Sequence, residues 1–341
     1  MRVAMYYNNS DVRLEEIPTP RIGPGELLVK VLASGICGSD VMEWYRIKKA
    51  PRVLGHEIAG EIVEVGRGVD QYKIGDRAFV SHHIPCNTCR YCLNGFHTLC
   101  DTLRKTNFDP GGFAEYLRVP WINVDRGVFL LPKEVSFEEG VFVEPLACVI
   151  RGQRVAKLEP GQSVLVIGSG ISGVLQIALA RASGAGWIVA SDIYDYRLKA
   201  AKQFGADEAI LAKEVSPAKI REINKGRLAD LVIVCAGTIS AYIQALQSVD
   251  RGGKVLSFAP LEPGLSFVFP FFDFWNDGIT LLSTYGGSPF DITMAIELIR
   301  AQRLPLQEMI THRLPLKDTG LGFQLVAEAK DSIKVIIEPH R

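Results

Sequence analysis

The chain has 341 residues, more than one hydrophobic core usually covers, so two domains are expected. Lys plus Arg equal Asp plus Glu at 38 each, which gives no reason to expect nucleic acid as a partner. There is no run of about 18 apolar residues and no apolar segment typical of a signal peptide, so the sequence predicts a cytoplasmic protein without a membrane partner.

The first 149 residues are rich in Gly, Pro and short β-branched runs, which predicts a mostly β domain with strands at 27–32, 58–65 and 77–80. Beyond residue 160, apolar runs alternate with segments of helical spacing. Strands are expected at 163–167, 187–191, 209–211, 231–235, 254–258 and 278–285, and helices at 171–183, 197–204, 217–224 and 240–249. This alternation indicates a parallel sheet covered on both faces, so the fold class is α/β.

A further helix opens at Ser288-Pro289, with Ser as the N-cap and Pro in the first turn. The tail, ending in KVIIEPH, returns to strand-like sequence that we expect to rejoin the first domain. The predicted organisation is therefore one domain made of 1–149 and 286–341, and a second domain of 150–285.

The segment GSGISG matches the dinucleotide-binding pattern G-x-G-x-x-G, and it follows an expected strand and opens an expected helix. Gly168 permits the tight turn, Gly170 lets the backbone approach a pyrophosphate, and Gly173 lets the helix pack on the sheet. The backbone amides at Ile171 and Ser172 then face the phosphates at the helix N-terminus. We predict a Rossmann doubly wound domain.

The second strand of this domain ends at Asp192, about 20 residues further on, as the fingerprint requires. An acid there binds the adenosine ribose hydroxyls and repels a 2′-phosphate, so NAD is predicted rather than NADP. Arg197 is close enough in sequence to reach the same ribose. The alternative is a Gly-rich turn with a surface Asp.

Four of the seven cysteines lie within fifteen residues, as C-x2-C-x2-C-x7-C: Cys86, Cys89, Cys92 and Cys100. Four thiolates from one short segment favour a closed, tetrahedral structural zinc site. The rival iron–sulfur cluster would have its fourth Cys after three residues, followed by Pro. Reduced free thiols remain a second alternative.

A second group of possible metal ligands comprises Cys37, His56 and Glu57, with Glu144 interrupting an otherwise apolar stretch. A catalytic zinc site uses three such ligands plus water, and a buried carboxylate needs a partner. A lone Cys or His is otherwise more often a satisfied core residue.

Taken together, CGSD, GHE, the clustered cysteines, EPLA and GSGISG resemble the zinc-containing medium-chain dehydrogenases, over essentially the whole chain. The sequence is most similar to the branch of sorbitol, threonine and cyclitol dehydrogenases. The resemblance implies a GroES-like catalytic domain beside the Rossmann domain, two zinc ions per chain, NAD, and a homodimer or homotetramer. It also implies oxidation of a small secondary alcohol, with the zinc as Lewis acid and NAD as hydride acceptor.

By the same resemblance, Cys37, His56 and Glu144 are the ligands of the catalytic zinc. Glu57 is either a direct ligand or a neighbour of the ligands. Ser39 matches the hydroxyl that contacts the substrate oxygen and passes its proton onward. Met42 stands where many relatives have a histidine at the outer end of this proton relay, and a thioether cannot carry a proton. Bound water is the preferred substitute, with a nearby side chain such as that of Glu43 or Tyr45 as the alternative.

The substrate stays open between polyols or cyclitols, amino alcohols of the threonine type and simple alcohols. EPLAC at 144–148 favours polyols, because the threonine type commonly has EP-x-GNA there. A non-catalytic NAD-sensing protein is a distant alternative, since no zinc ligand is lost. The aromatic run at 269–275 is expected to be a buried packing cluster rather than a pocket lining or an oligomer interface.

Overall fold

The computed structural model describes residues 1–341 and divides into two compact units. The terminal unit consists of Met1–Ala147 and Gly287–Arg341, and the central unit of Cys148–Gly286. Helix α6 (Val143–Ala156) contains the first of these boundaries. No helix combines the length and the apolar character needed to cross a membrane.

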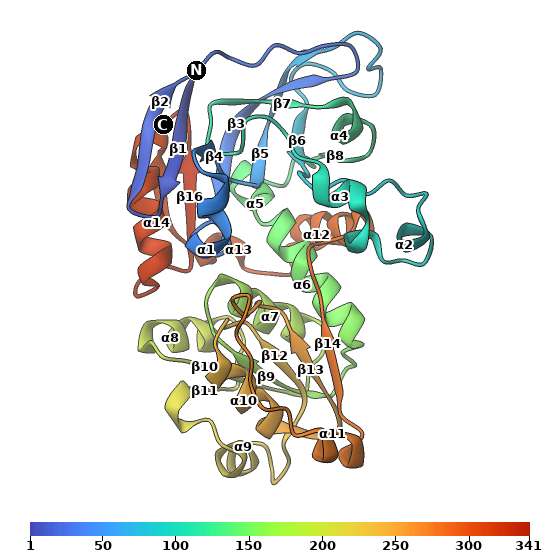
Figure 1. Ribbon diagram of the computed structural model, residues 1–341, viewed down its shortest axis with the longest axis vertical. Helices are drawn as coiled ribbons and strands as arrows, with labels where there is room; N and C mark the ends of the chain where they lie inside the picture. Colours follow the sequence, from blue (N-terminus) through green and yellow to red (C-terminus); the bar gives the residue numbers. More distant parts are fainter. The chain divides into compact units, whose positions relative to one another are not determined.

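The terminal unit is mostly β, and both chain ends lie in it (Figure 1). Its larger sheet has the order β15-β16-β3-β5-β6-β8, with β7 also paired to β3, and its smaller sheet has the order β2-β1-β4. The strands are β1 (Arg2–Asn8), β2 (Asp11–Glu16), β3 (Leu27–Gly35), β4 (Arg52–Val53), β5 (Glu57–Val65), β6 (Arg77–Val80), β7 (Tyr116–Val119), β8 (Val128–Leu130), β15 (Ile310–Pro315) and β16 (Lys334–Glu338).

Helices of four to twelve residues lie between these strands. They are α1 (Glu43–Arg46), α2 (Arg90–Leu93), α3 (Asp101–Lys105), α4 (Trp121–Arg126), α5 (Phe137–Gly140), α12 (Pro289–Arg300), α13 (Leu306–Met309) and α14 (Thr319–Glu328). Ser288 caps α12 and forms a capping box with Asp291, as the Ser-Pro start predicts.

Strand β3 is central to the terminal unit, because it pairs with β5, β7 and β16. The pairing with β16 brings the tail of the chain back to the N-terminal half, with Ile336 opposite Gly35. Two large apolar clusters lie in this unit, apart from a small one at the clustered cysteines. One lies around β3, β5 and β6, and the other joins β1 and β4 to α14 and β16.

The central unit contains one parallel sheet of six strands in the order β11-β10-β9-β12-β13-β14. Numbered from β9, this is the 3-2-1-4-5-6 order of a dinucleotide-binding sheet, whose strand order reverses between β9 and β12. The strands are β9 (Ser163–Ile167), β10 (Trp187–Asp192), β11 (Glu208–Leu211), β12 (Ala229–Val234), β13 (Val249–Ser257) and β14 (Thr280–Ser283).

Apolar side chains cover both faces of this sheet, as the continuous apolar runs predict. Alternate residues of β9 point to opposite faces: Leu165 joins a cluster with α9 and α10, and Val166 one with α7 and α8. The helices are α7 (Ile171–Ala182), α8 (Asp195–Gln203), α9 (Pro217–Ile223), α10 (Ile239–Ser248) and α11 (Phe271–Asp277).

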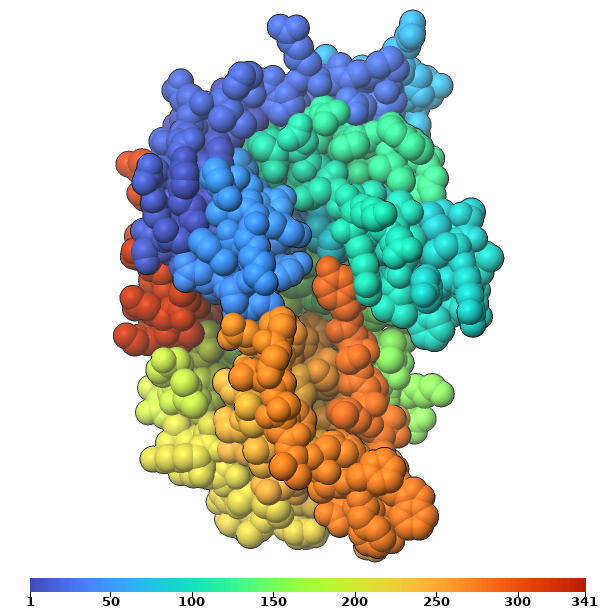
Figure 2. Space-filling model, in the orientation of Figure 1, coloured from blue at the N-terminus to red at the C-terminus, as the bar shows by residue number.

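The interpretation of 269–275 as a buried packing cluster is wrong for most of its aromatic residues. Only Phe274 is buried, while Phe271, Phe272 and Trp275 have 73%, 68% and 71% of their surface exposed. Helix α11 has seven residues and can bury only one face. The orange segment around it lies on the surface of the central unit (Figure 2).

Candidate functional site

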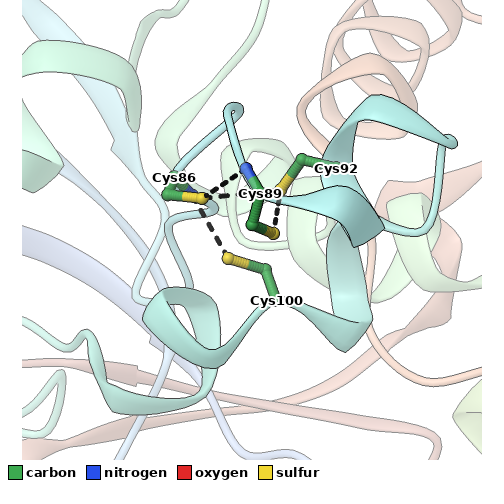
Figure 3. A group of neighbouring side chains, drawn as sticks. All are labelled: Cys86, Cys89, Cys92 and Cys100. Carbon is green, nitrogen blue, oxygen red and sulfur yellow. Dashed lines mark hydrogen bonds between the residues drawn. The ribbon is translucent and has the colours of Figure 1, made fainter.

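The four clustered cysteines converge in one small lobe of the terminal unit (Figure 3). The sulfur of Cys92 lies 3.6 Å from that of Cys89 and 4.0 Å from that of Cys86. These separations bracket the roughly 3.8 Å that a tetrahedral site with Zn–S bonds of about 2.3 Å requires. The residues therefore fit a closed zinc site.

The surroundings of the clustered sulfurs shift the pKa values of Cys86 and Cys92 in opposite directions. The backbone amide and hydroxyl of Thr88 lower the pKa of Cys86 to about 5. Burial instead raises the pKa of Cys92 to about 12, so this thiol needs a metal ion to become a thiolate. A cation bound at the centre would compensate for the charge of all four sulfurs.

The second metal-binding group is formed by Cys37, His56 and Glu57, whose ligand atoms lie within 4.8 Å of one another. Glu57 is the first residue of β5, and Cys37 follows β3, the strand paired with it. Sulfur, imidazole nitrogen and carboxylate oxygen are all zinc donors, and three protein ligands are typical of a catalytic site. The donor set therefore fits a reactive zinc.

Glu57 is held by a buried ion pair with Lys334, the first residue of β16. The two side chains are 1% and 0% exposed, and the ammonium contacts Oε2. The other oxygen, Oε1, is buried without a hydrogen-bond partner, as expected of an atom that faces a metal. A Cβ on Gly35 would lie 2.2 Å from Oε2, so only glycine fits beside the pair.

His56 is oriented by Asp40, which sequence reasoning left without a role. Asp40 is fully buried, and its Oδ1 lies 3.4 Å from Nδ1 of the imidazole, which leaves the other ring nitrogen for a metal. Burial alone would lower the pKa of His56, but Asp40 raises it well above its ordinary value. Asp40 therefore favours the charged imidazole, and a metal ion would compete with a proton for this ring.

Ser39 and Asp40 share a further partner, Arg46 at the end of α1. Its Nε donates to the backbone carbonyl of Ser39 at 2.9 Å, and its Nη2 donates to Ser39 Oγ at 3.0 Å and Asp40 Oδ1 at 3.2 Å. The Ser39 hydroxyl also lies 3.4 Å from Cys37 Sγ, on the side of the candidate metal site.

The structure does not bring Glu144 into the group of Cys37, His56 and Glu57. Instead it lines a small neighbouring cavity of the terminal unit. Ser81, His82 and His83 line the same cavity, together with Ala147, Gly287 and Ile292. The centroid of the His82 ring lies 5.0 Å from that of His56 and 3.8 Å from that of His83. A small cavity with a mixed polar and apolar lining therefore adjoins the candidate zinc ligands.

The dinucleotide fingerprint lies where the strand order reverses, between β9 and α7. Gly168 has a φ of +94°, which favours glycine. A Cβ on Gly173 would come within 1.9 Å of the Gly168 carbonyl oxygen, so the helix can pack there only as glycine. No side chain caps α7 at Gly170, and the first-turn amides, including those of Ile171 and Ser172, are thus available to a phosphate.

Asp192 ends β10 and is held rigidly. Its carboxylate accepts hydrogen bonds from the backbone amides of Ser169 at 2.7 Å and Tyr194 at 3.1 Å. Arg197 lies 3.8 Å from the same carboxylate and packs beside Gly170. The predicted cofactor residues of this unit are therefore gathered at one edge of its sheet.

Sequence reasoning missed Asp40, Arg46, His82 and Lys334. Asp40 lies inside the CGSD motif and had a local signal. Lys334 had none, because 277 residues separate it from Glu57.

Two family models match the chain. "Alcohol dehydrogenase GroES-like domain" matches residues 23–132, and "Zinc-binding dehydrogenase" matches residues 173–301. The expected GroES-like and Rossmann architecture is confirmed by these matches and by the solved structures that resemble the chain.

Two curated relatives have different substrates in their names. Sorbitol dehydrogenase of Bacillus subtilis (strain 168) is 32% identical over 100% of this chain and 98% of its own. L-Threonine 3-dehydrogenase of Symbiobacterium thermophilum is 32% identical over 96% and 94%. Among solved structures, a zinc-binding dehydrogenase of Sinorhizobium meliloti 1021 bound to NADP has a TM-score of 0.88, with 27% identity over 99% of both chains.

Proposed function

From the premise that this chain belongs to the zinc-containing medium-chain alcohol and polyol dehydrogenase family, we propose that it oxidises a secondary alcohol of a polyol or cyclitol with NAD. Membership makes it an oxidoreductase with zinc and a nicotinamide dinucleotide as cofactors. The substrate, the choice of NAD and the individual residue roles are the proposal.

Cys37, His56 and Glu57 would hold the reactive zinc, and the four-cysteine lobe the structural one. Bound zinc supplies Lewis-acid polarisation of the alcohol oxygen, and NAD accepts the hydride. Glu57 is favoured as third ligand over Glu144, because its Oε1 is buried near Cys37 and His56 without another partner. Ser39, with its hydroxyl beside Cys37 Sγ, would contact the substrate oxygen and receive its proton.

The observation that favours this substrate class is the segment EPLAC at 144–148, where the threonine type commonly has EP-x-GNA. A relative that matches the chain over its whole length, sorbitol dehydrogenase of Bacillus subtilis, is named for a polyol.

The test is a comparison of kcat/KM for NAD reduction across sorbitol, xylitol, galactitol, myo-inositol, 2,3-butanediol and L-threonine. We expect the highest value for a polyol or cyclitol, and no turnover in Cys37→Ser with a polyol. L-Threonine as the best substrate would refute the polyol assignment and leave the family unaffected.

NAD is proposed over NADP because of Asp192. Two backbone amides fix its carboxylate, which would face a 2′-phosphate with like charge. Arg197 lies 3.8 Å from this carboxylate, so the positive charge of Arg197 is partly neutralised and attracts a 2′-phosphate less.

We propose that a second copy of the chain covers the exposed aromatic face of the central unit. Phe271, Phe272 and Trp275 lie on α11, and Leu281, 46% exposed, lies on the edge strand β14. An open edge beside such a patch is typical of a surface that pairs with another subunit. Light scattering should give a dimer or tetramer, and Trp275→Glu should shift it toward the monomer. A wild-type monomer would refute the assignment.

None of the seven cysteines forms a disulfide, which suits a location in the cytoplasm.

A further inference from the structure

We infer that Arg46 is a positioning residue of the reacting centre, whose single guanidinium orients both the Ser39 hydroxyl and the Asp40 carboxylate that fixes His56. The inference rests on the proposed function in its kinetic part only. Arg46 connects Ser39, the proposed proton acceptor, with His56, the proposed metal ligand, to which it is linked through Asp40.

The inference rests on the geometry of the Arg46 guanidinium, whose nitrogens form a fork of hydrogen-bond donors. Three hydrogen bonds of 2.9 to 3.2 Å run from Arg46 to the carbonyl and hydroxyl of Ser39 and to Asp40 Oδ1. The Arg46 side chain is 15% exposed, so water competes little with these bonds, and its ring contact with Tyr45 at 4.8 Å further restricts it. A planar guanidinium has fixed donor directions, which lets it hold several acceptors in one arrangement.

The first consequence concerns Ser39. Its oxygen accepts a hydrogen bond from Arg46, so its own hydrogen cannot point toward the guanidinium. The hydroxyl donates instead to Cys37 Sγ, at 3.4 Å. Arg46 thus turns the reactive side of the hydroxyl toward the zinc ligands.

The second consequence concerns His56. Asp40 Oδ2 accepts the backbone amide of Cys37 at 3.1 Å, and Oδ1 faces both Arg46 and the imidazole. Arg46 therefore completes the fixation of this carboxylate. Residues behind a metal ligand commonly affect metal affinity by about 10- to 100-fold.

Arg46 contacts Ser39 in this chain, which has Met42 in place of a relay histidine. Glu43 is exposed and its carboxylate accepts the backbone amide of Asn9 at 3.2 Å, while Tyr45 is 39% exposed. Arg46 contacts Ser39 instead, yet a guanidinium stays protonated and cannot carry a proton. Its role is therefore orientation.

The experiment compares Arg46→Met, Ser39→Ala and the double variant. Zinc affinity is measured by competition with a chromophoric chelator, and kcat at saturating zinc with the best alcohol of the panel. We expect Arg46→Met to weaken zinc binding at one of two sites by about 10-fold or more, and Ser39→Ala to leave zinc affinity unchanged. In the wild-type protein, Arg46→Met should lower kcat about tenfold or more. In the Ser39→Ala variant, the same substitution should lower kcat less than about threefold, because the hydroxyl that Arg46 orients is already absent.

The matched control is Arg13→Met, which removes an arginine bonded to Asp11 through a side chain that is 61% exposed. Arg13→Met should change neither the zinc affinity nor kcat. If Arg46→Met does not fold, Arg46→Lys keeps the charge without the fork and should still lower kcat. Wild-type zinc affinity and kcat in Arg46→Met, or wild-type kcat in Arg46→Lys, would overturn the inference. Wild-type protein that oxidises no alcohol would refute the proposed function, while the zinc measurements would still decide the role of Arg46.

Discussion

Replacing Lys334 by Met should strongly destabilise the terminal unit. The substitution keeps the approximate length of the side chain but leaves the carboxylate of Glu57, 1% exposed, without its counter-charge. Breaking a buried ion pair from one side costs about 3–5 kcal/mol. For a unit of about 200 residues, at about 2–4 °C per kcal/mol, the unfolding temperature should fall by roughly 6–20 °C.

Differential scanning calorimetry before zinc is added provides the assay, and two further variants make it specific. Lys330→Met removes a lysine that is 67% exposed and paired with Glu328, and should cost less than about 1 kcal/mol. Combining Lys334→Met with Glu57→Gln removes both charges and should recover much of the loss. Excess Zn2+ should also recover part of it in the single variant, because a cation bound by Glu57 replaces the missing positive charge. A fall of less than about 2 °C in Lys334→Met would refute this reasoning.

Three other changes test the remaining parts of the chain. Cys89→Ser should lower the zinc content from two ions to one per chain by elemental analysis and lower the unfolding temperature, because it opens a closed site; an unchanged zinc content would contradict the assignment. Asp192→Ala should raise the ratio of kcat/KM for NADP over NAD by more than about tenfold, because a like-charge repulsion is removed; an unchanged ratio would show that Asp192 does not select the cofactor. Gly173→Ala places a methyl group against the Gly168 carbonyl and should destabilise the central unit by about 1–3 kcal/mol or more in thermal unfolding; wild-type stability would show that α7 can move away.

Most elements of the central unit could be predicted because their signals are local. The run Ser163–Ile167 is buried along its whole length and coincides with β9, and the helix expected at 171–183 is α7, which ends one residue earlier. The strand expected at 254–258 instead begins at Val249, where the polar residues before Gly253 hid it. Its pairing with β12 shifts register there, and no local periodicity reports such an irregularity.

The candidate site could be predicted only where its residues form short motifs. CGSD and GHE contain Cys37, His56 and Glu57, which the structure brings together. The EPLA motif identified Glu144 as a residue suited to bind zinc. It did not predict that Glu144 lines the neighbouring cavity rather than joining this group.

Lys334 contacts Glu57 from 277 residues away. Arg46 contacts Ser39 and Asp40 through side-chain geometry that no sequence motif marks. The roles of both residues therefore became visible only in the fold.

The partnership between Glu57 and Lys334 bears on the order in which the protein is completed during synthesis. The four cysteines span fifteen residues, so their lobe can close soon after it leaves the ribosome. Glu57 must wait for a lysine that lies 277 residues further along the chain. Chains that stop before Lys334 would carry the Glu57 carboxylate with no counter-charge beside two candidate zinc ligands. The candidate zinc ligands around Glu57 therefore gain this counter-charge only after Lys334 has been synthesised, later than the cysteine lobe can close.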